Sequence, residues 1–195
     1  MRLTLSQIYA YVLIDQLENV RYLAKLQRLA FLALYAELRN DYLVLQPMET
    51  PLRNVLNFVV GRRGPVSRVL RRVVLEELPS LGLINVECLR RSGSRCLEWF
   101  VERRSRVDVY GDAKRMGIDI DRVKNIVAKL GDLSVGKLSK LCRSLIHPYE
   151  NEVGTPIEIV VARILEARKP VDEFLRVVDE IVKSVGGSCE AFAEI

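Results

Sequence analysis

Histidine is almost absent from this chain of 195 residues, which contains only His147. One imidazole is too few for a multi-histidine metal site, and any histidine-based catalytic triad would depend on this residue alone. Pro148 and Tyr149 follow His147, and we interpret the three residues as a structural turn rather than part of a catalytic site. The segment GRRGP, which begins at Gly61, also lacks the GK[ST] ending of a phosphate-binding P-loop. We therefore expect neither enzymatic activity nor a cofactor.

Cysteine spacing typical of a zinc site is also missing. The four cysteines, Cys88, Cys96, Cys142 and Cys189, form no C-x-x-C pair. Thiols stay reduced inside most cells, and buried cysteines pack as small hydrophobic side chains. We predict that all four are reduced, that most are buried and that none binds a metal ion.

No apolar run approaches the roughly 20 residues that a helix needs to cross a bilayer. The longest candidate is LAFLALYA. The first residues, MRLTLSQIYAY, lack the charged start, apolar run and small-residue cleavage site of a secretion signal. We expect a cytoplasmic protein with no membrane partner.

Lysine is absent from residues 61–106, although this stretch carries eleven arginines and five glutamates, a net charge of +6. The whole chain has a net charge of +5, so the remainder sums to −1. Arginine offers a planar fork that binds phosphate at two points. Three interpretations remain open: contact with nucleic acid, contact with an acidic protein surface, or a solvated surface of Glu–Arg pairs in a heat-adapted protein.

The same stretch has the order of elements of a winged helix-turn-helix: a turn, a helix, a second turn and a β-hairpin. Gly64-Pro65 marks the first turn, and Ser67 is predicted to cap the helix. Apolar residues recur at helical spacing up to Leu78, and Pro79 should end the helix because it cannot donate a backbone hydrogen bond. Three arginines on the other side of the helix share one face: Arg68, Arg71 and Arg72.

Alternating apolar and polar residues predict a hairpin over residues 84–101. A two-residue turn at Ser92-Gly93 places the large apolar residues of both strands on one face. The cross-strand pairs are then Cys88–Leu97, Val86–Trp99 and Ile84–Val101.

This register has two consequences near the turn. Cys88 and Cys96 point to opposite faces, so we predict that they are not bonded to each other. Arg90 lies opposite Arg95 with Arg91 beside them, and like charges in this position repel unless they splay into water or an anion lies between them.

Helices are predicted on both sides of this unit, at about residues 7–18, 21–38, 119–130, 135–147, 156–169 and 171–185. Residues 40–51 are expected to be a loop, and residues 107–117 show no helical or strand period. The predicted fold is mainly α with a small β-hairpin, and a winged-helix-like unit is embedded in a helical domain. Residues 1–106 would hold the N-terminal helices and the winged-helix-like unit, with a C-terminal helical region at 107–195 packed on it.

Individual residues mark the ends and faces of these helices. Ser6 and Ser134 are predicted N-caps, and either Asp119 or Asp121 should cap the helix between them. We interpret Asp119 and Asp121 as capping residues, although two carboxylates this close also occur in hydrolase sites. In the second helix, Arg28 should face away from the apolar stripe, together with Arg21 and Lys25, and Gln27 should bond locally or to a neighbouring loop.

Two proline-containing segments mark the C-terminal helices. The sequence Thr155-Pro156-Ile157-Glu158 has the pattern of a capping box with proline at the first helical position. Pro170 should separate that helix from the last one.

Several short motifs resemble the Panacea-type domains, a family that includes SocA-like antitoxins and YwgA-like proteins. They are Lys25-Leu26-Gln27-Arg28-Leu29, Phe58, Gly64-Pro65-Val66-Ser67, Leu81-Gly82-Leu83-Ile84, Leu133-Ser134 through Leu138-Ser139, and His147-Pro148. The resemblance implies a mostly helical fold and regulation through protein contacts, and it brings no catalytic residues with it. The Arg90–Arg95 hairpin is longer and more basic than that family leads us to expect, and the final two helices have no counterpart there.

We therefore expect a non-enzymatic regulatory protein that binds nucleic acid, in particular double-stranded DNA, through its arginine-rich helix and wing. The alternative is an antitoxin-like module that recognises an acidic protein partner, and a homodimer is also left open. The expected binding residues are Arg62, Arg63, Arg68, Arg71, Arg72, Arg90, Arg91 and Arg95.

Overall fold

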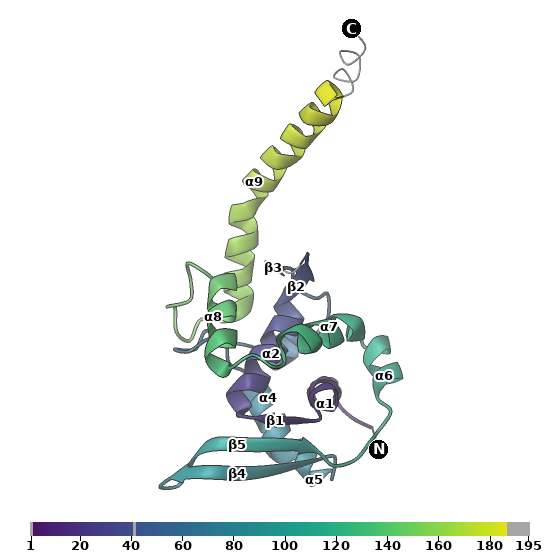
Figure 1. Ribbon diagram of the computed structural model, residues 1–195, viewed down its shortest axis with the longest axis vertical. Helices are drawn as coiled ribbons and strands as arrows, with labels where there is room; N and C mark the ends of the chain where they lie inside the picture. The colour runs from purple at the N-terminus through teal and green to yellow at the C-terminus, as the bar shows by residue number, and fades with distance from the viewer. Residues whose placement is uncertain (1, 41, 187–195) are drawn as a thin grey trace. The chain divides into compact units, whose positions relative to one another are not determined.

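The structure is a computed structural model of the chain, and it describes residues 2–40 and 42–186. The fold is mainly α-helical with two small antiparallel sheets (Figure 1), which confirms the predicted class of a mainly α protein with a small β component. One compact unit ends at Glu158 and a second begins at Ile159. The sequence suggested a boundary after Arg106, but the three helices between Arg106 and Leu145 each contact one or both of the N-terminal helices and belong to the first unit.

The described elements follow in chain order. The helices of the first unit are α1 (Leu5–Leu17), α2 (Leu23–Tyr35), α3 (Leu52–Leu56), α4 (Arg68–Arg72), the π-helical turn η1 (Val73–Glu77), α5 (Leu78–Ser80), α6 (Tyr110–Arg115), α7 (Ile120–Leu130) and α8 (Val135–Leu145). Helix α9 (Ile157–Gly186) begins in the first unit and forms the described part of the second. The strands are β1 (Asn19–Arg21), β2 (Ala36–Arg39), β3 (Tyr42–Leu45), β4 (Ile84–Ser92) and β5 (Arg95–Arg103).

Helix α1 lies in the middle of the first unit. Every residue from Ile8 to Ile14 is at most 1% exposed, which is expected of a helix that is apolar on all sides. It contacts α2, α4, α7 and β5, and the Tyr9 hydroxyl donates a 2.7 Å hydrogen bond to the Ala30 carbonyl of α2. The predicted N-cap Ser6 is wrong, because Thr4 caps this helix in a reciprocal capping box with Gln7.

Three aromatic rings fill the core beside α2. Phe31 stacks on Tyr35 with ring centroids 5.0 Å apart, and Phe58 meets Phe31 edge-on at 6.0 Å. All three side chains are at most 1% exposed. This confirms the prediction that the apolar face of the second helix lies in the core.

Helix α2 ends at Tyr35, three residues before the predicted end, and the expected loop at 40–51 contains a strand. The helix can end here because other segments donate hydrogen bonds to carbonyls at and just after its last turn, and the chain continues as β2. The Gln46 N–H donates to the Tyr35 carbonyl and the Met48 N–H to the Leu34 carbonyl. The Arg122 guanidinium reaches the Ala36 carbonyl at 2.9 Å.

The arginine-rich helix is one continuous rod made of α4, η1 and α5. It runs to Ser80, so Pro79 does not stop it directly. The Leu78 N–H bonds the Val73 carbonyl five residues earlier, the wider spacing of a π turn. The helix then ends within one residue of the proline.

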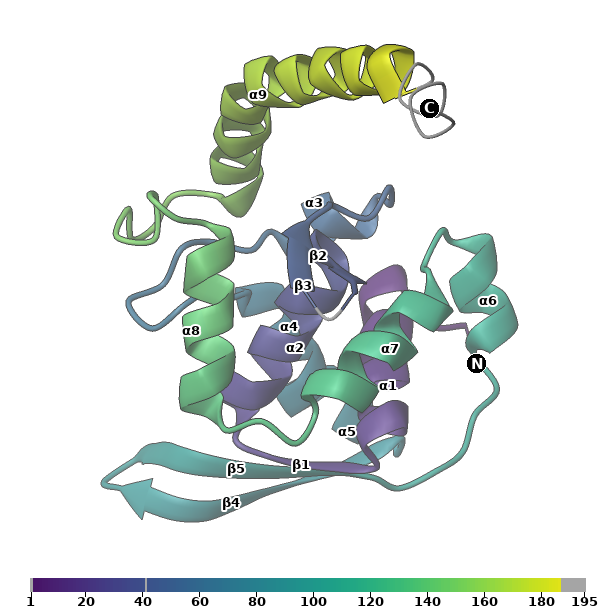
Figure 2. The ribbon, with the colours of Figure 1, turned by 45° about the horizontal axis from the view of Figure 1, so that its top comes forward.

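The larger sheet has the strand order β1-β5-β4, so β5 lies in the middle. Val101 of β5 pairs with Val20 of β1 on one side and with Val86 of β4 on the other. The segment at Asn19-Val20, which the sequence suggested was only a joint, is thus a strand. Figures 1 and 2 both show the β4–β5 hairpin running along one side of the helices, with its turn projecting beyond them.

The helix boundaries after the sheet are partly as predicted. Ser134 caps α8, as expected, and of the two candidates Asp119 and Asp121 it is Asp119 that caps α7. Helix α6 was not predicted. The capping box at Thr155 is wrong, because Glu158 accepts hydrogen bonds from the Tyr35 hydroxyl and the Arg53 guanidinium instead.

Helix α9 continues through Pro170, so the predicted break there is also wrong. Several large apolar side chains on this part of the helix are more than half exposed: Val171, Phe174 and Leu175. The apolar face predicted for the last helix is therefore not covered within the described chain.

Replacing Phe31 by alanine should destabilise the protein by about 3–5 kcal/mol, the usual loss when an aromatic core site is emptied. The measurement is the free energy of unfolding from urea titration. The matched control is Tyr42→Ala, because Tyr42 is 77% exposed and its truncation should change stability by about 0.5 kcal/mol or less. Equal effects in the two variants would contradict the core position of Phe31.

Candidate nucleic-acid interface

The arginine-rich helix begins at a loop that α2 holds by two hydrogen bonds. The Gln27 amide N–H donates to the Ser67 carbonyl at 2.8 Å, and the Ser67 N–H donates to the Gln27 amide oxygen at 2.7 Å. Both residues are buried. The side-chain amide thus pairs with one residue of the loop as a neighbouring strand would, which confirms that Gln27 bonds to a neighbouring loop.

Arg28, the next residue of α2, is only 4% exposed, so the expectation that it faces away from the core is wrong. Its guanidinium donates to the carbonyls of Pro65 and Arg63 and, at 3.3 Å, to the Ser139 hydroxyl. It makes no ion pair within the part of the chain that the structure describes. Burial lowers the pKa of Arg28.

Gly64 is the residue that allows this packing. Its φ is +110°, a conformation that side chains rarely adopt, and an added Cβ would lie 2.9 Å from Nε of Arg28. The glycine lets the loop turn directly over the guanidinium. Gly64-Pro65 is therefore a turn, as predicted, and the partner that requires the glycine comes from α2.

Ser67 links this loop to the helix. Its hydroxyl accepts a 3.0 Å hydrogen bond from the Leu70 N–H, which confirms it as the N-cap of α4, and it donates to the Leu56 carbonyl. With its backbone held by Gln27, every polar group of Ser67 has a partner or caps the helix. The position of Arg68 at the start of α4 is fixed by these contacts.

The hairpin has a different register from the predicted one. Ser92 pairs with Arg95, so the two loop residues are Gly93 and Ser94 rather than Ser92 and Gly93. Gly93 has a φ of +57° and takes the first loop position, where a residue with a side chain would be strained. The apolar residues keep their predicted face because each partner moves by two positions, the repeat of a strand.

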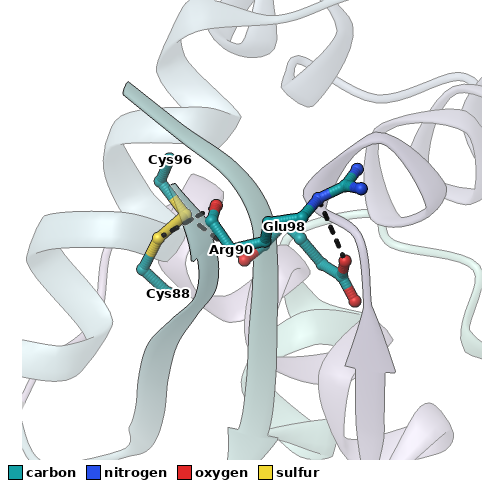
Figure 3. Close-up of a disulfide and its surroundings, with 4 residues drawn as sticks. All are labelled: Cys88, Arg90, Cys96 and Glu98. Atoms are coloured by element: carbon teal, nitrogen blue, oxygen red, sulfur yellow. Dashed lines mark hydrogen bonds and ion pairs between the residues drawn. A yellow bond between two sulfur atoms is a disulfide. The ribbon is translucent and has the colours of Figure 1, made fainter. Parts of the chain in front are cut away.

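The corrected register changes the partner of Arg90. It lies opposite Glu98 instead of Arg95, and the two charged groups are 3.8 Å apart. Glu98 is 5% exposed and also accepts a hydrogen bond from Arg21 of β1. The repulsion expected at the tip is thus replaced, for Arg90, by a shared ion pair on the side away from the two cysteines (Figure 3).

Cys88 and Cys96 form a disulfide, so the prediction that they are unbonded is wrong. The reason lies in two irregularities of the ladder, which leave Leu89 and Leu97 without cross-strand partners. Such bulges bring residues together that a regular ladder would separate. The two Cα atoms are 5.9 Å apart, within the range that a disulfide spans. Cys142 is free and buried, as predicted, and Cys189 lies outside the described residues.

All eight predicted binding arginines are exposed. Arg72 pairs with Glu77 at 2.9 Å and Arg90 with Glu98. The other six have no ion-pair partner among residues 2–40 and 42–186: Arg62, Arg63, Arg68, Arg71, Arg91 and Arg95.

A hollow of about 430 Å³ lies between α2, the start of α4 and β5. Arg68 and Arg71 line it from the helix, and Leu97 and Trp99 line it from the hairpin. Arg91 is paired across the strands with Cys96, another residue of the lining. The arginine-rich helix and the β4–β5 hairpin therefore line the same hollow.

Sequence reasoning missed the burial of Arg28 and did not identify the loop that Gln27 bonds. The available signal was the presence of two polar side chains within a helix that is buried along most of its length. Polar groups in such a position are buried only with hydrogen-bond partners. The partners themselves lie about 40 residues away, so the sequence did not reveal them.

His147 is not part of the lining of this hollow. His147 is exposed in the turn after α8, and its ring lies 3.2 Å from the Glu150 carboxylate. No group of three or more potential metal ligands occurs within the described residues. Within the same residues, no helix combines the length and apolar character needed to span a bilayer.

Comparison with protein-family models, curated proteins and solved structures finds no match to this chain.

The pairing of Gln27 with Ser67 predicts a large effect for Gln27→Leu. The variant leaves the buried Ser67 N–H without a partner, while the Ser67 carbonyl keeps its hydrogen bond from the Arg71 N–H at 3.2 Å. The free energy of unfolding should therefore fall by about 1–3 kcal/mol. The control is Gln46→Leu, the same change at an exposed side chain, which should change stability by about 0.5 kcal/mol or less. Equal urea midpoints for Gln27→Leu and the wild type would show that the pairing does not stabilise the fold.

Proposed function

We propose that this protein is a non-enzymatic regulator that binds nucleic acid, in particular double-stranded DNA, through α4 and the β4–β5 hairpin. The observation that carries the proposal is the group of six exposed arginines without acidic partners within the described chain. Two of them, Arg68 and Arg71, line the hollow beside the hairpin. Phosphate contacts supply most of the sequence-independent affinity of such proteins. Arg68 and Arg71 would lie in or beside the major groove, and the hairpin arginines would contact the backbone or the minor groove.

The distribution of ion pairs favours this function over a heat-adapted surface. In that interpretation, glutamates would neutralise most of the arginines. Only Arg72 and Arg90 of the eight predicted residues have such a partner within the described chain. An uncompensated positive surface is instead what an anionic partner requires.

The order of elements also supports a winged-helix-like unit. Two helices, α1 and α2, precede the arginine-rich helix, and the hairpin follows it directly. Strand β1 completes a sheet with the order β1-β5-β4. One departure is the chain from Ala36 to Ser67 between α2 and α4, where a helix-turn-helix has a turn of about three or four residues.

The alternative is an antitoxin-like module that binds an acidic protein partner through the same arginines. Two of the motifs that resemble the Panacea-type domains contact each other here, because Gln27 and Arg28 bond to the loop at Gly64–Ser67. Because of that contact, we propose that the first unit folds like a Panacea-type domain. Arg68 and Arg71 are equally available to a carboxylate-rich surface, so both functions remain candidates. Either function, as we propose it, is exercised in the cytoplasm.

The two hairpin arginines without ion-pair partners provide the main test. Changing Arg91 and Arg95 to alanine should leave the stability nearly unchanged, because both are exposed. If both meet phosphate, the dependence of log K on log salt for duplex DNA should flatten by up to about 2 units. Fluorescence anisotropy with a labelled duplex at several salt concentrations measures this slope.

The control removes the same charge elsewhere, with Arg39→Ala and Arg115→Ala. Arg115 belongs to α6, which lies far from the hairpin turn in Figures 1 and 2. The salt dependence of DNA binding by this control variant should stay near that of the wild type. If wild-type protein binds neither DNA nor RNA at low salt, the nucleic-acid proposal fails. Retention of an acidic protein partner by the wild type, with loss in the Arg91/Arg95 variant, would then favour the alternative.

The helix arginines should behave differently from those of the hairpin. If α4 reads base edges, Arg71→Ala should change which duplexes are preferred, by about 1–3 kcal/mol at the affected base pair. Selection from a random duplex library with wild-type and variant protein measures that preference. An unchanged preference with uniformly weaker binding would assign Arg71 to the phosphate backbone.

We further propose that the protein is a homodimer through α9. Val171, Phe174 and Val178 are exposed and follow the 3–4 spacing of a coiled-coil seam, which a second copy of the same helix would cover. Phe174→Asp should then convert a dimer into a monomer in sedimentation equilibrium, and Arg168→Asp, on an exposed charged position, should not. A wild-type protein that sediments as a monomer at high concentration would contradict this assembly.

A further inference from the structure

The hollow between α2, α4 and β5 combines a large apolar surface with an excess of positive charge. Three arginines line it, Arg28, Arg68 and Arg71, and none of the described residues of its lining is acidic. Its volume of about 430 Å³ lies in the range of pockets that hold small organic molecules. The composition of the lining therefore limits what such a molecule can be.

The apolar part is a platform of side chains that solvent can reach. Leu97 is 47% exposed and Tyr22 is 38% exposed, and Trp99 lies between exposed and buried. Large side chains of this kind are usually covered, and aromatic rings among them offer faces on which another ring can stack. A flat apolar group fits this part of the hollow.

Tyr22 is held beside Trp99 in an unusual backbone conformation. Its φ is +76°, which is rare for a bulky residue, and its N–H donates a 2.7 Å hydrogen bond to the Trp99 carbonyl. Strained residues of this sort concentrate at ligand sites, where the surrounding structure holds a side chain in place. Tyr22, which has this unusual backbone conformation, is thus one of the residues that line the hollow.

The charged part of the lining has no counterion within the described chain. Arg28 is almost fully buried and its guanidinium is bonded only to carbonyls and a hydroxyl. Arg68 and Arg71 are exposed and make no ion pair there. Cations in a partly desolvated hollow attract an anion more strongly than the same cations in water.

We propose that this hollow binds a small aromatic carboxylate, with its ring on Trp99 and Leu97 and its carboxylate at Arg68 and Arg71. A guanidinium pairs with a carboxylate through two parallel hydrogen bonds, and one or two rings fit the volume. In the proposed function Arg68 and Arg71 also contact nucleic acid, so the ligand should compete with duplex DNA for binding. This second statement rests on the proposed function, but the binding itself does not.

Trp99 is the only tryptophan of the chain, so its fluorescence reports directly on this site. The probe is 3-phenylpropionate, and 3-phenylpropanamide is its uncharged analogue. Titration of the full-length protein should change Trp99 emission saturably at concentrations up to about 10 mM, where ligands of this size bind. The acid should bind about tenfold more tightly than the amide, because it alone forms charged hydrogen bonds.

Two charge-matched variants test the role of the arginines. Arg71→Gln should weaken binding of the acid about tenfold and leave binding of the amide unchanged. Arg115→Gln should leave both unchanged, because Arg115 lies on α6 and pairs with Asp112. Circular dichroism and melting temperatures check that each variant is folded.

Three results would overturn the site: no saturable change in Trp99 emission, equal affinity for acid and amide, or equal affinity of Arg71→Gln and wild type for the acid. Competition is then measured with labelled duplex, which 3-phenylpropionate should displace from wild-type protein. If the wild type binds the acid but no duplex, the proposed function fails and the carboxylate site stands. If it binds duplex but not the acid, the site fails and the proposed function stands.

Discussion

The pairing of Gln27 with Ser67 is the interaction on which the rest of this surface depends. It joins the buried helix α2 to the loop that starts the arginine-rich helix. Both partners are buried, so losing either would leave polar groups without hydrogen bonds in an apolar environment. Arg28 extends the same contact under Gly64. These contacts hold the start of α4 against α2, and the two helices together form one side of the hollow.

The other wall depends on strand β5. Its central place in the sheet ties the hairpin to β1, which leads directly into α2, so both sides of the hollow are connected to the same helix. The backbone bond from Tyr22 to Trp99 lies at this junction. A surface built in this way can present arginines from distant segments at constant spacing, which is what recognition of a repeating phosphate backbone requires.

The hairpin shows how neighbouring charges are accommodated without weakening the sheet. The buried carboxylate of Glu98 lies close to two arginines, Arg21 and Arg90, one from each flanking strand. Ion pairs on an exposed surface are worth little, but a carboxylate that is 5% exposed must be paired to be tolerated. Arg91 and Arg95 have no comparable partner within the described chain, and their side chains remain available at the tip. Beside them, the Cys88–Cys96 disulfide links the two strands next to the bulges.

The sequence by itself determined the helical class, the apolar face of α2, the N-caps Ser67 and Ser134, and the concentration of arginine in one stretch. These features depend on local periodicity and on residues a few positions apart, which a sequence displays directly. Only the tertiary structure decided the burial of Arg28, the partner of Arg90, the bonding of Cys88 to Cys96 and the partners of Glu158. Each of these depends on a contact across the chain or on a shift in strand register. Arg28 and Arg68 look equivalent in the sequence, but they differ in burial. Arg28 is buried because its guanidinium donates hydrogen bonds to carbonyls of the neighbouring loop, whereas Arg68 is exposed.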